Sequence, residues 1–124
     1  MSSVIDTILD PQIWLVLVAV VHALVGVILP TEWEDDTNRL VSGWFLLTTV
    51  TMLGTAFLLE GEAMARMAVV IAGPVWVWFV IIGAQGLEWN LGKTQMKMNW
   101  KENAPPLVLW GILALSGLLG SGWV

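Results

Sequence analysis

Four long apolar stretches dominate this 124-residue chain, and short polar segments separate them. The first runs from Pro11 to Leu29, and at ~1.5 Å per helical residue its length matches a ~30 Å hydrocarbon core. With 57% hydrophobic and 12% charged residues, the chain holds more apolar surface than a soluble core of this size buries. The sequence therefore predicts an all-α integral membrane protein with four transmembrane helices in a single domain over residues 1–124.

Boundary signals place the four crossings at about 11–29, 40–59, 63–85 and 105–123. Asp10 suits the N-cap of a helix that starts at Pro11, and Pro30 ends the first crossing. Gly73 and Pro74 interrupt the third crossing, where we expect a kink because proline lacks the N–H of a helical hydrogen bond. A short amphipathic N-terminal segment is expected before the first crossing.

The polar segment 86–104 contains Lys93, Lys97 and Lys101 at four-residue spacing. As a helix it would present these lysines on one stripe, facing the headgroups of anionic lipids. The alternation of apolar and polar residues over 96–100 is equally compatible with an extended segment. Lysine and arginine are more numerous in the first and third loops than on the opposite side, so both termini are expected to face away from the cytoplasm.

Small residues recur at helical spacing and predict close packing of helices. They flank His22 in the first crossing, form one face of the third and make two overlapping small-xxx-small pairs in the fourth: Ala19, Ala23, Gly26, Ala68, Ala72, Ser116, Gly117, Gly120 and Ser121. The chain also has nine tryptophans and no tyrosine. Most of the tryptophans, Trp110 among them, are expected near the membrane boundaries as an aromatic belt.

His22 is the only histidine of the chain and lies near the centre of the first crossing. An ionisable residue at that depth indicates a functional site by default. Hydroxyl side chains lie near the centres of other crossings, so we predict a polar cluster near the bilayer midplane that comprises His22, Thr48, Thr51, Thr55 and Ser116. The competing interpretation is a neutral histidine that stabilises one packing arrangement, with threonines bonded to their own helix backbone.

His22 is also the candidate ligand for a cofactor. A six-coordinate haem would need a second ligand from another subunit, whereas a chlorophyll-type pigment could take this histidine alone. The chain has no cysteine, and the sequence predicts neither a metal site nor a catalytic constellation. Lysines and arginines form no cluster wide enough to follow a phosphate backbone, so nucleic acid is not an expected partner.

The sequence favours a non-catalytic subunit of a larger integral-membrane complex. Its expected partners are other membrane subunits or copies of itself, together with anionic lipids. The alternative is a homo-oligomeric transporter or channel, in which His22 and the threonine stripe of the second crossing line the route. A membrane enzyme is less favoured, because the membrane interior offers one histidine and no nucleophile with an acid–base partner.

Overall fold

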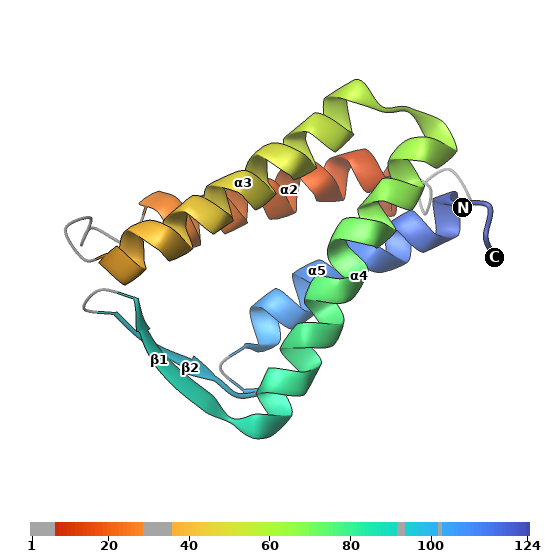
Figure 1. Cartoon of the computed structure of the whole chain (residues 1–124). Coiled ribbons are helices and arrows are strands. Elements are labelled where there is room, and N and C mark those ends of the chain that lie inside the picture. The colour runs from red at the N-terminus through yellow and green to blue at the C-terminus, as the bar shows by residue number, and fades with distance from the viewer. Residues whose placement is uncertain (1–6, 29–35, 92–93, 102) are drawn as a thin grey trace.

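The computed structural model describes residues 7–28, 36–91, 94–101 and 103–124. Helices account for most of these residues, and the rest include one small β-hairpin (Figure 1). The elements are, in chain order, α2 (Pro11–Ala23), the π-helical turn η1 (Leu24–Ile28), α3 (Asp36–Leu58), α4 (Gly61–Gln85), β1 (Leu87–Leu91), β2 (Thr94–Met98) and α5 (Ala104–Gly120).

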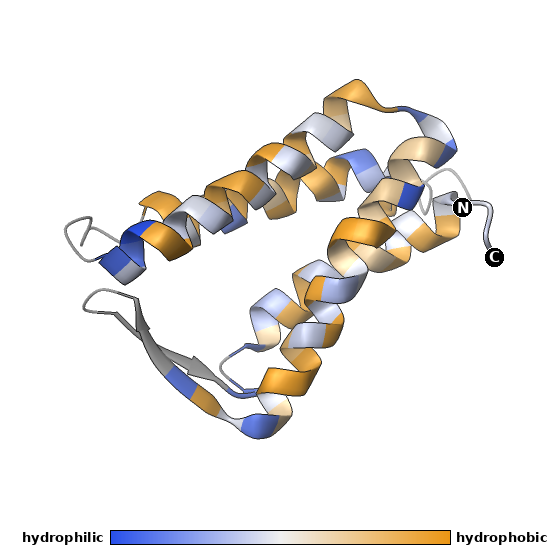
Figure 2. Cartoon of the chain, viewed as in Figure 1, coloured by the Kyte–Doolittle hydropathy of each residue, from blue (hydrophilic) through white to orange (hydrophobic). Residues whose placement is uncertain are grey.

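Three helical segments are long and apolar enough to cross a membrane: Pro11–Ile28, Asp36–Leu58 and Gly61–Gln85. The shortest has 18 residues. At ~1.5 Å per residue it spans ~27 Å, close to the ~30 Å of a bilayer core. Hydrophilic residues gather at the start of α3 and in the turn between α3 and α4 (Figure 2). These features are consistent with a multi-pass membrane protein.

Helix α5 is apolar, but with 17 residues it is shorter than the three membrane-length segments. Proline occupies its first turn, as the sequence predicts for a helix start. The helix ends at Gly120, shortly before Gly122, whose φ of 76° is not a right-handed helical value. The crossing predicted over 105–123 therefore corresponds to a shorter helix, and a fourth crossing stays a prediction.

The other helix boundaries follow the signals in the sequence. Asp10 caps α2 by accepting a hydrogen bond of 3.0 Å from the backbone N–H of Gln12, and Pro11 occupies the first helical position. Pro74 lies inside α4, which continues on both sides of it, and the kink expected there stays a prediction. Most of the predicted amphipathic N-terminal segment lies outside the described residues.

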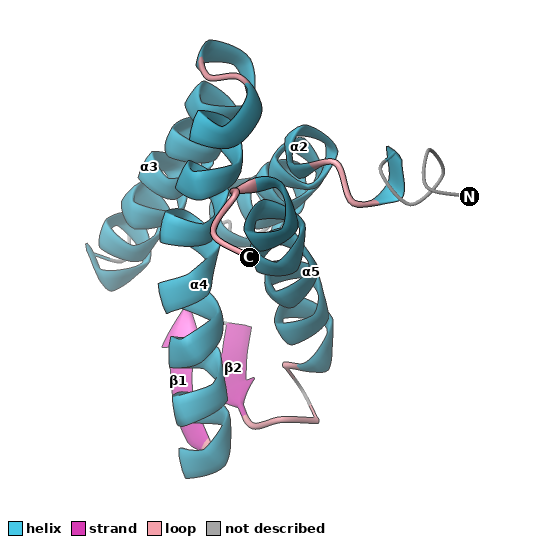
Figure 3. Cartoon of the chain, turned by 90° about the vertical axis from the view of Figure 1, so that its right-hand side faces the viewer, coloured by secondary structure: helices cyan, strands magenta, loops and turns pink. Residues whose placement is uncertain are grey.

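Two helix pairs make up the fold. Helix α2 packs along α3, α4 packs along α5, and α2 also contacts α5. In Figure 1 the two pairs lie close together beside the turn between α3 and α4, and they separate toward the β-hairpin. Figure 3 shows α4 and α5 side by side, with the strands level with the lower half of α4. The pairs therefore diverge toward the hairpin end of the molecule.

Small residues allow the closest contacts between helices. A Cβ atom added to Gly117 of α5 would lie 2.6 Å from the backbone carbonyl oxygen of Ala65 in α4. These two helices therefore meet nearly backbone to backbone, as membrane helices do where small residues face each other. Larger side chains fill the centre between the pairs, where the most deeply buried are Leu15, Val18, Met52 and Leu113.

The basic segment 86–104 contains the β-hairpin. Strand β1 pairs antiparallel with β2, in a register that places Glu88 opposite Lys97. The extended alternative is therefore the one found over Leu87–Leu91 and Thr94–Met98, so Lys97 lies on a strand and not on a helix. Beyond β2, Trp100 donates a hydrogen bond of 3.1 Å from its indole N–H to a backbone carbonyl of α4, which attaches this segment to the helix.

Candidate functional site: an aromatic pocket at His22

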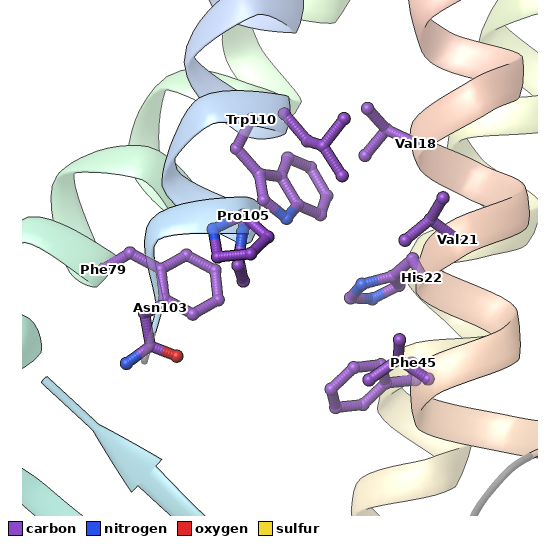
Figure 4. A pocket seen from close by; sticks show the side chains of 11 residues that line it. Val18, Val21, His22, Phe45, Phe79, Asn103, Pro105 and Trp110 are labelled. Atoms are coloured by element: carbon purple, nitrogen blue, oxygen red, sulfur yellow. The ribbon is translucent and has the colours of Figure 1, made fainter. Parts of the chain in front are cut away.

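A pocket of about 190 Å³ lies between the two helix pairs. All four long helices and the turn η1 contribute to its wall, and most of the lining side chains are apolar (Figure 4). The lining residues are Val18, Val21, His22, Val25, Phe45, Phe79, Asn103, Pro105, Pro106, Leu109 and Trp110. His22 is the only ionisable residue among them. The pocket therefore surrounds the histidine that the sequence singles out.

The contacts of His22 are aromatic. Its ring stacks on Phe45 of α3, with ring centroids 4.3 Å apart and an angle of 19° between the planes. It meets Trp110 of α5 edge to face, with centroids 5.4 Å apart and planes at 88°. Within the described part of the chain, His22 has no hydrogen-bond partner. Its ring nitrogens are therefore available to a molecule in the pocket, into which the ring points (Figure 4).

The position of Phe45 depends on Gly26. This glycine lies in η1, four residues after His22, and a Cβ atom on it would overlap the ring of Phe45. Glycine therefore lets α3 bring Phe45 against His22. A π-helical turn is rare and is found frequently at functional sites. Sequence reasoning missed both Phe45 and the π turn, and the only signal for either was a small residue one turn from His22.

Trp110 is the second residue of the site that the sequence did not reveal. The sequence places it in the aromatic belt, whereas in the structure it is 4% exposed and lines the pocket. Asn103, just before α5, also lines the pocket and donates a hydrogen bond of 3.0 Å to the carbonyl of Asn99. The polar groups of the wall thus come from α2, from the residue just before α5 and from α5 itself.

The five residues of the predicted midplane cluster do not form hydrogen bonds between side chains. Thr48, Thr51 and Thr55 each donate to the backbone carbonyl four residues earlier in α3, over 2.8 to 2.9 Å. Ser116 donates to a backbone carbonyl within α5 over 2.8 Å. Of the five, only His22 lines the pocket. The hydroxyl groups therefore have partners in their own helices, as threonines and serines in membrane helices often do.

The small residues predicted to pack lie at different degrees of burial. Ala23 is partly exposed and Gly120 is exposed, although a Cβ on Gly120 would lie 3.2 Å from the Cβ of Ala65. The others are buried: Ala19, Gly26, Ala68, Ala72, Ser116, Gly117 and Ser121. Most of these positions thus serve contacts within the chain.

The three lysines predicted to bind lipid headgroups are not all described. Lys93 lies outside the described residues, and Lys97 belongs to β2. Lys101 is exposed in the turn that leads from β2 to α5. Their binding to anionic lipid stays a prediction.

The volume of the pocket limits what it can hold. A cavity of ~150 Å³ binds benzene, whereas pockets for drug-sized ligands begin at ~300 Å³. A pocket of about 190 Å³ is therefore sized for one ring with small substituents, and the four-pyrrole macrocycle of a haem or chlorophyll-type pigment does not fit in it. The described residues contain no group of three or more His, Cys, Asp or Glu side chains that could hold a metal ion.

Comparison of the chain with protein families, with curated proteins and with solved structures finds no match.

Proposed function

We propose that this protein is a small non-catalytic subunit of a larger integral-membrane complex. In this proposal α2 with η1, α3, α4 and α5 each cross the bilayer and form a single transmembrane domain. Both termini face the non-cytoplasmic side. The outward face of α3 contacts a neighbouring membrane subunit of different sequence.

The observation that carries this proposal is a pair of glycines on α3. A Cβ atom added to Gly43 or Gly54 would meet, outside the local backbone of α3, no atom of the described residues within 4 Å, so packing among the described elements requires neither glycine. Gly43, Leu47, Val50 and Gly54 follow the spacing i, i+4, i+7 and i+11, which places them on one helix face. Leu47 and Val50 are 65% and 59% exposed. Because membrane helices approach each other through small residues, this face favours contact with another helix.

Other glycines of the chain provide a contrast. Gly26 lies against Phe45, and Gly117 lies against the backbone of Ala65, so each has a partner inside the chain. Glycine weakens a helix by roughly 1 kcal/mol relative to alanine, and a close contact offsets that cost at these two positions. Gly43 and Gly54 have no such contact with the described part of the chain, which supports a contact with another subunit.

The alternative of a homo-oligomeric transporter or channel receives less support. Its route requires His22 and the threonine stripe to line one surface. The pocket that contains His22 lies between the helix pairs, and Thr48 and Thr51 do not line it. Their hydroxyl groups already donate to carbonyls of α3. A route would therefore need a second copy of the chain to bring these groups together.

Large side chains at Gly43 and Gly54 should prevent this face of α3 from contacting a neighbouring subunit. We expect the amount of membrane subunits that co-purify with the double variant Gly43→Leu, Gly54→Leu to fall about tenfold. This decrease corresponds to ~1.4 kcal/mol of contact free energy. The measurement is extraction of a tagged chain from its native membrane in mild detergent, followed by quantitative mass spectrometry. The control is Val70→Phe, which adds bulk at an exposed position of α4 and should keep the partners.

Two results would contradict the proposal. Full retention of partners by the double glycine variant would reject the α3 face as the contact surface. Recovery of the wild-type chain as a homo-oligomer, with no other subunit, would reject the subunit role and favour the transport alternative.

The basic hairpin segment should bind anionic lipid. We expect the triple variant Lys93→Gln, Lys97→Gln, Lys101→Gln to retain less phosphatidylglycerol, because each lysine near an anionic surface contributes ~1 kcal/mol. The measurement is the lipid retained after purification, analysed by mass spectrometry, with retention of neutral phosphatidylcholine as the control. Equal phosphatidylglycerol retention by variant and wild type would show that these lysines do not bind headgroups.

A further inference from the structure

Trp110 presents to the pocket an indole N–H that has no hydrogen-bond partner in the described part of the chain. The residue is 4% exposed, and in the described part of the chain its indole Nε1–H donates to no group. Figure 4 shows the indole nitrogen on the edge of the ring that faces the pocket. By contrast, the indole N–H groups of Trp14 and Trp100 donate to backbone carbonyls. The pocket therefore contains a donor that is open to an acceptor from outside the chain.

His22 supplies a second polar group beside this donor. The rings of His22 and Trp110 have centroids 5.4 Å apart, and the histidine also lacks a hydrogen-bond partner among the described residues. An indole N–H is only a donor, whereas a neutral imidazole has one donor and one acceptor nitrogen. A ligand oxygen with two lone pairs can accept from both residues. The site therefore matches a carbonyl oxygen.

The rest of the wall matches an apolar ring. Valine, proline and leucine side chains form most of it, and the rings of Phe45 and Phe79 contribute aromatic surface. Aromatic rings pack favourably against other planar rings in stacked or edge-to-face arrangements. The volume of about 190 Å³ fits one such ring with small substituents. Val25 and Pro105 line the pocket and are also exposed at the surface of the chain, so a ring substituent can leave the pocket beside them.

We propose that this pocket binds the ring of a lipid-soluble quinone. One quinone carbonyl oxygen accepts from the indole N–H of Trp110 and from a ring N–H of His22, and the ring lies against Phe45 and Phe79. A quinone combines a planar apolar ring, carbonyl acceptors and solubility in the bilayer, which are the properties that the pocket selects. The proposal concerns binding, and it holds or fails independently of the subunit role because it is tested on the isolated chain.

The test is a titration of the full-length chain in nanodiscs with tetramethylbenzoquinone. Nitrogen-15 labelling of tryptophan gives one indole N–H signal per tryptophan, and Trp110→Phe identifies the signal of Trp110. We expect the quinone to shift this signal saturably, as a new hydrogen bond does. Tetramethylbenzene has the same ring and methyl groups but no oxygen, and we expect it to bind at least about tenfold more weakly.

Variants of Trp110 and His22 distinguish the contribution of hydrogen bonds to quinone binding from that of packing. We expect Trp110→Phe and His22→Phe each to weaken quinone binding, measured by equilibrium dialysis, about tenfold, while Trp76→Phe leaves it unchanged. Trp76 is outside the pocket lining. No saturable shift, equal binding of the quinone and the hydrocarbon, or unchanged binding by Trp110→Phe would each overturn the proposal. The ligand comparison uses wild-type protein, so it decides the question even where a variant does not fold.

Discussion

Replacement of Gly26 by alanine is expected to destabilise the protein by about 2 kcal/mol, within the range typical of overpacking in a tight interior. The added Cβ would overlap the ring of Phe45 and lie 2.6 Å from its Cβ, so rotation of the ring cannot relieve the contact. Helix α3 must instead move away from η1, and the stack of Phe45 on His22 is lost with it. The measurement is reversible unfolding by SDS in mixed micelles, followed by far-ultraviolet circular dichroism.

Gly54→Ala is the matched control for this prediction. The same methyl group is added to a glycine on α3, where no atom lies within 4 Å of the new Cβ. We expect no loss of stability in the isolated chain and a gain of up to about 1 kcal/mol, because alanine favours a helix over glycine where nothing obstructs its methyl group. Similar losses for the two variants would show that Phe45 does not lie against Gly26 in the membrane.

Gly117→Ala is expected to cost about 2 kcal/mol through a different contact. Its Cβ would lie 2.6 Å from the carbonyl oxygen of Ala65, and a backbone atom cannot rotate aside as a side chain does. Helices α4 and α5 would therefore have to separate along their contact. The free energy of unfolding in the same micelles measures this effect.

Gly120→Ala, three residues further along α5, tests whether backbone contact is the cause. Its Cβ would lie 3.2 Å from the Cβ of Ala65 and 3.7 Å from Cγ of Pro11, which are side-chain atoms at longer distances. We expect a loss of less than about 1 kcal/mol. A loss at Gly120 equal to or larger than that at Gly117 would contradict the backbone contact between α4 and α5.

The long helices could be predicted because their signals are local. Apolar length is set by the thickness of a bilayer, and Asp10 and Pro11 mark a helix start through groups that lie within a few residues of each other. The structure contains three helices of membrane length that correspond to the first three predicted crossings. Predicted and observed boundaries differ by a few residues, because the terminal turns of α3 include polar residues such as Asp36 that hydropathy alone excludes.

The candidate site could be predicted only in part, because its parts come from distant segments of the chain. His22 was evident as the one ionisable residue at membrane depth. Phe45 and Trp110 are ordinary aromatic residues in apolar helices. Nothing near them in the sequence indicates that they contact His22. The hairpin was ambiguous for another reason, since the lysine spacing favoured a helix and the alternation over 96–100 favoured a strand.

In the proposed membrane arrangement, the β-hairpin limits where the pocket can lie in the bilayer. Each strand of a two-stranded sheet has a free edge, so alternate N–H and C=O groups of β1 and β2 point away from the partner strand. Hydrocarbon offers these groups no partner, and the hairpin must therefore lie in the headgroup layer or in water. Asn103 and Pro105 follow β2 within a few residues and line the pocket. In the proposed four-crossing arrangement, the pocket therefore lies toward the leaflet on the hairpin side, from which a ligand would reach it.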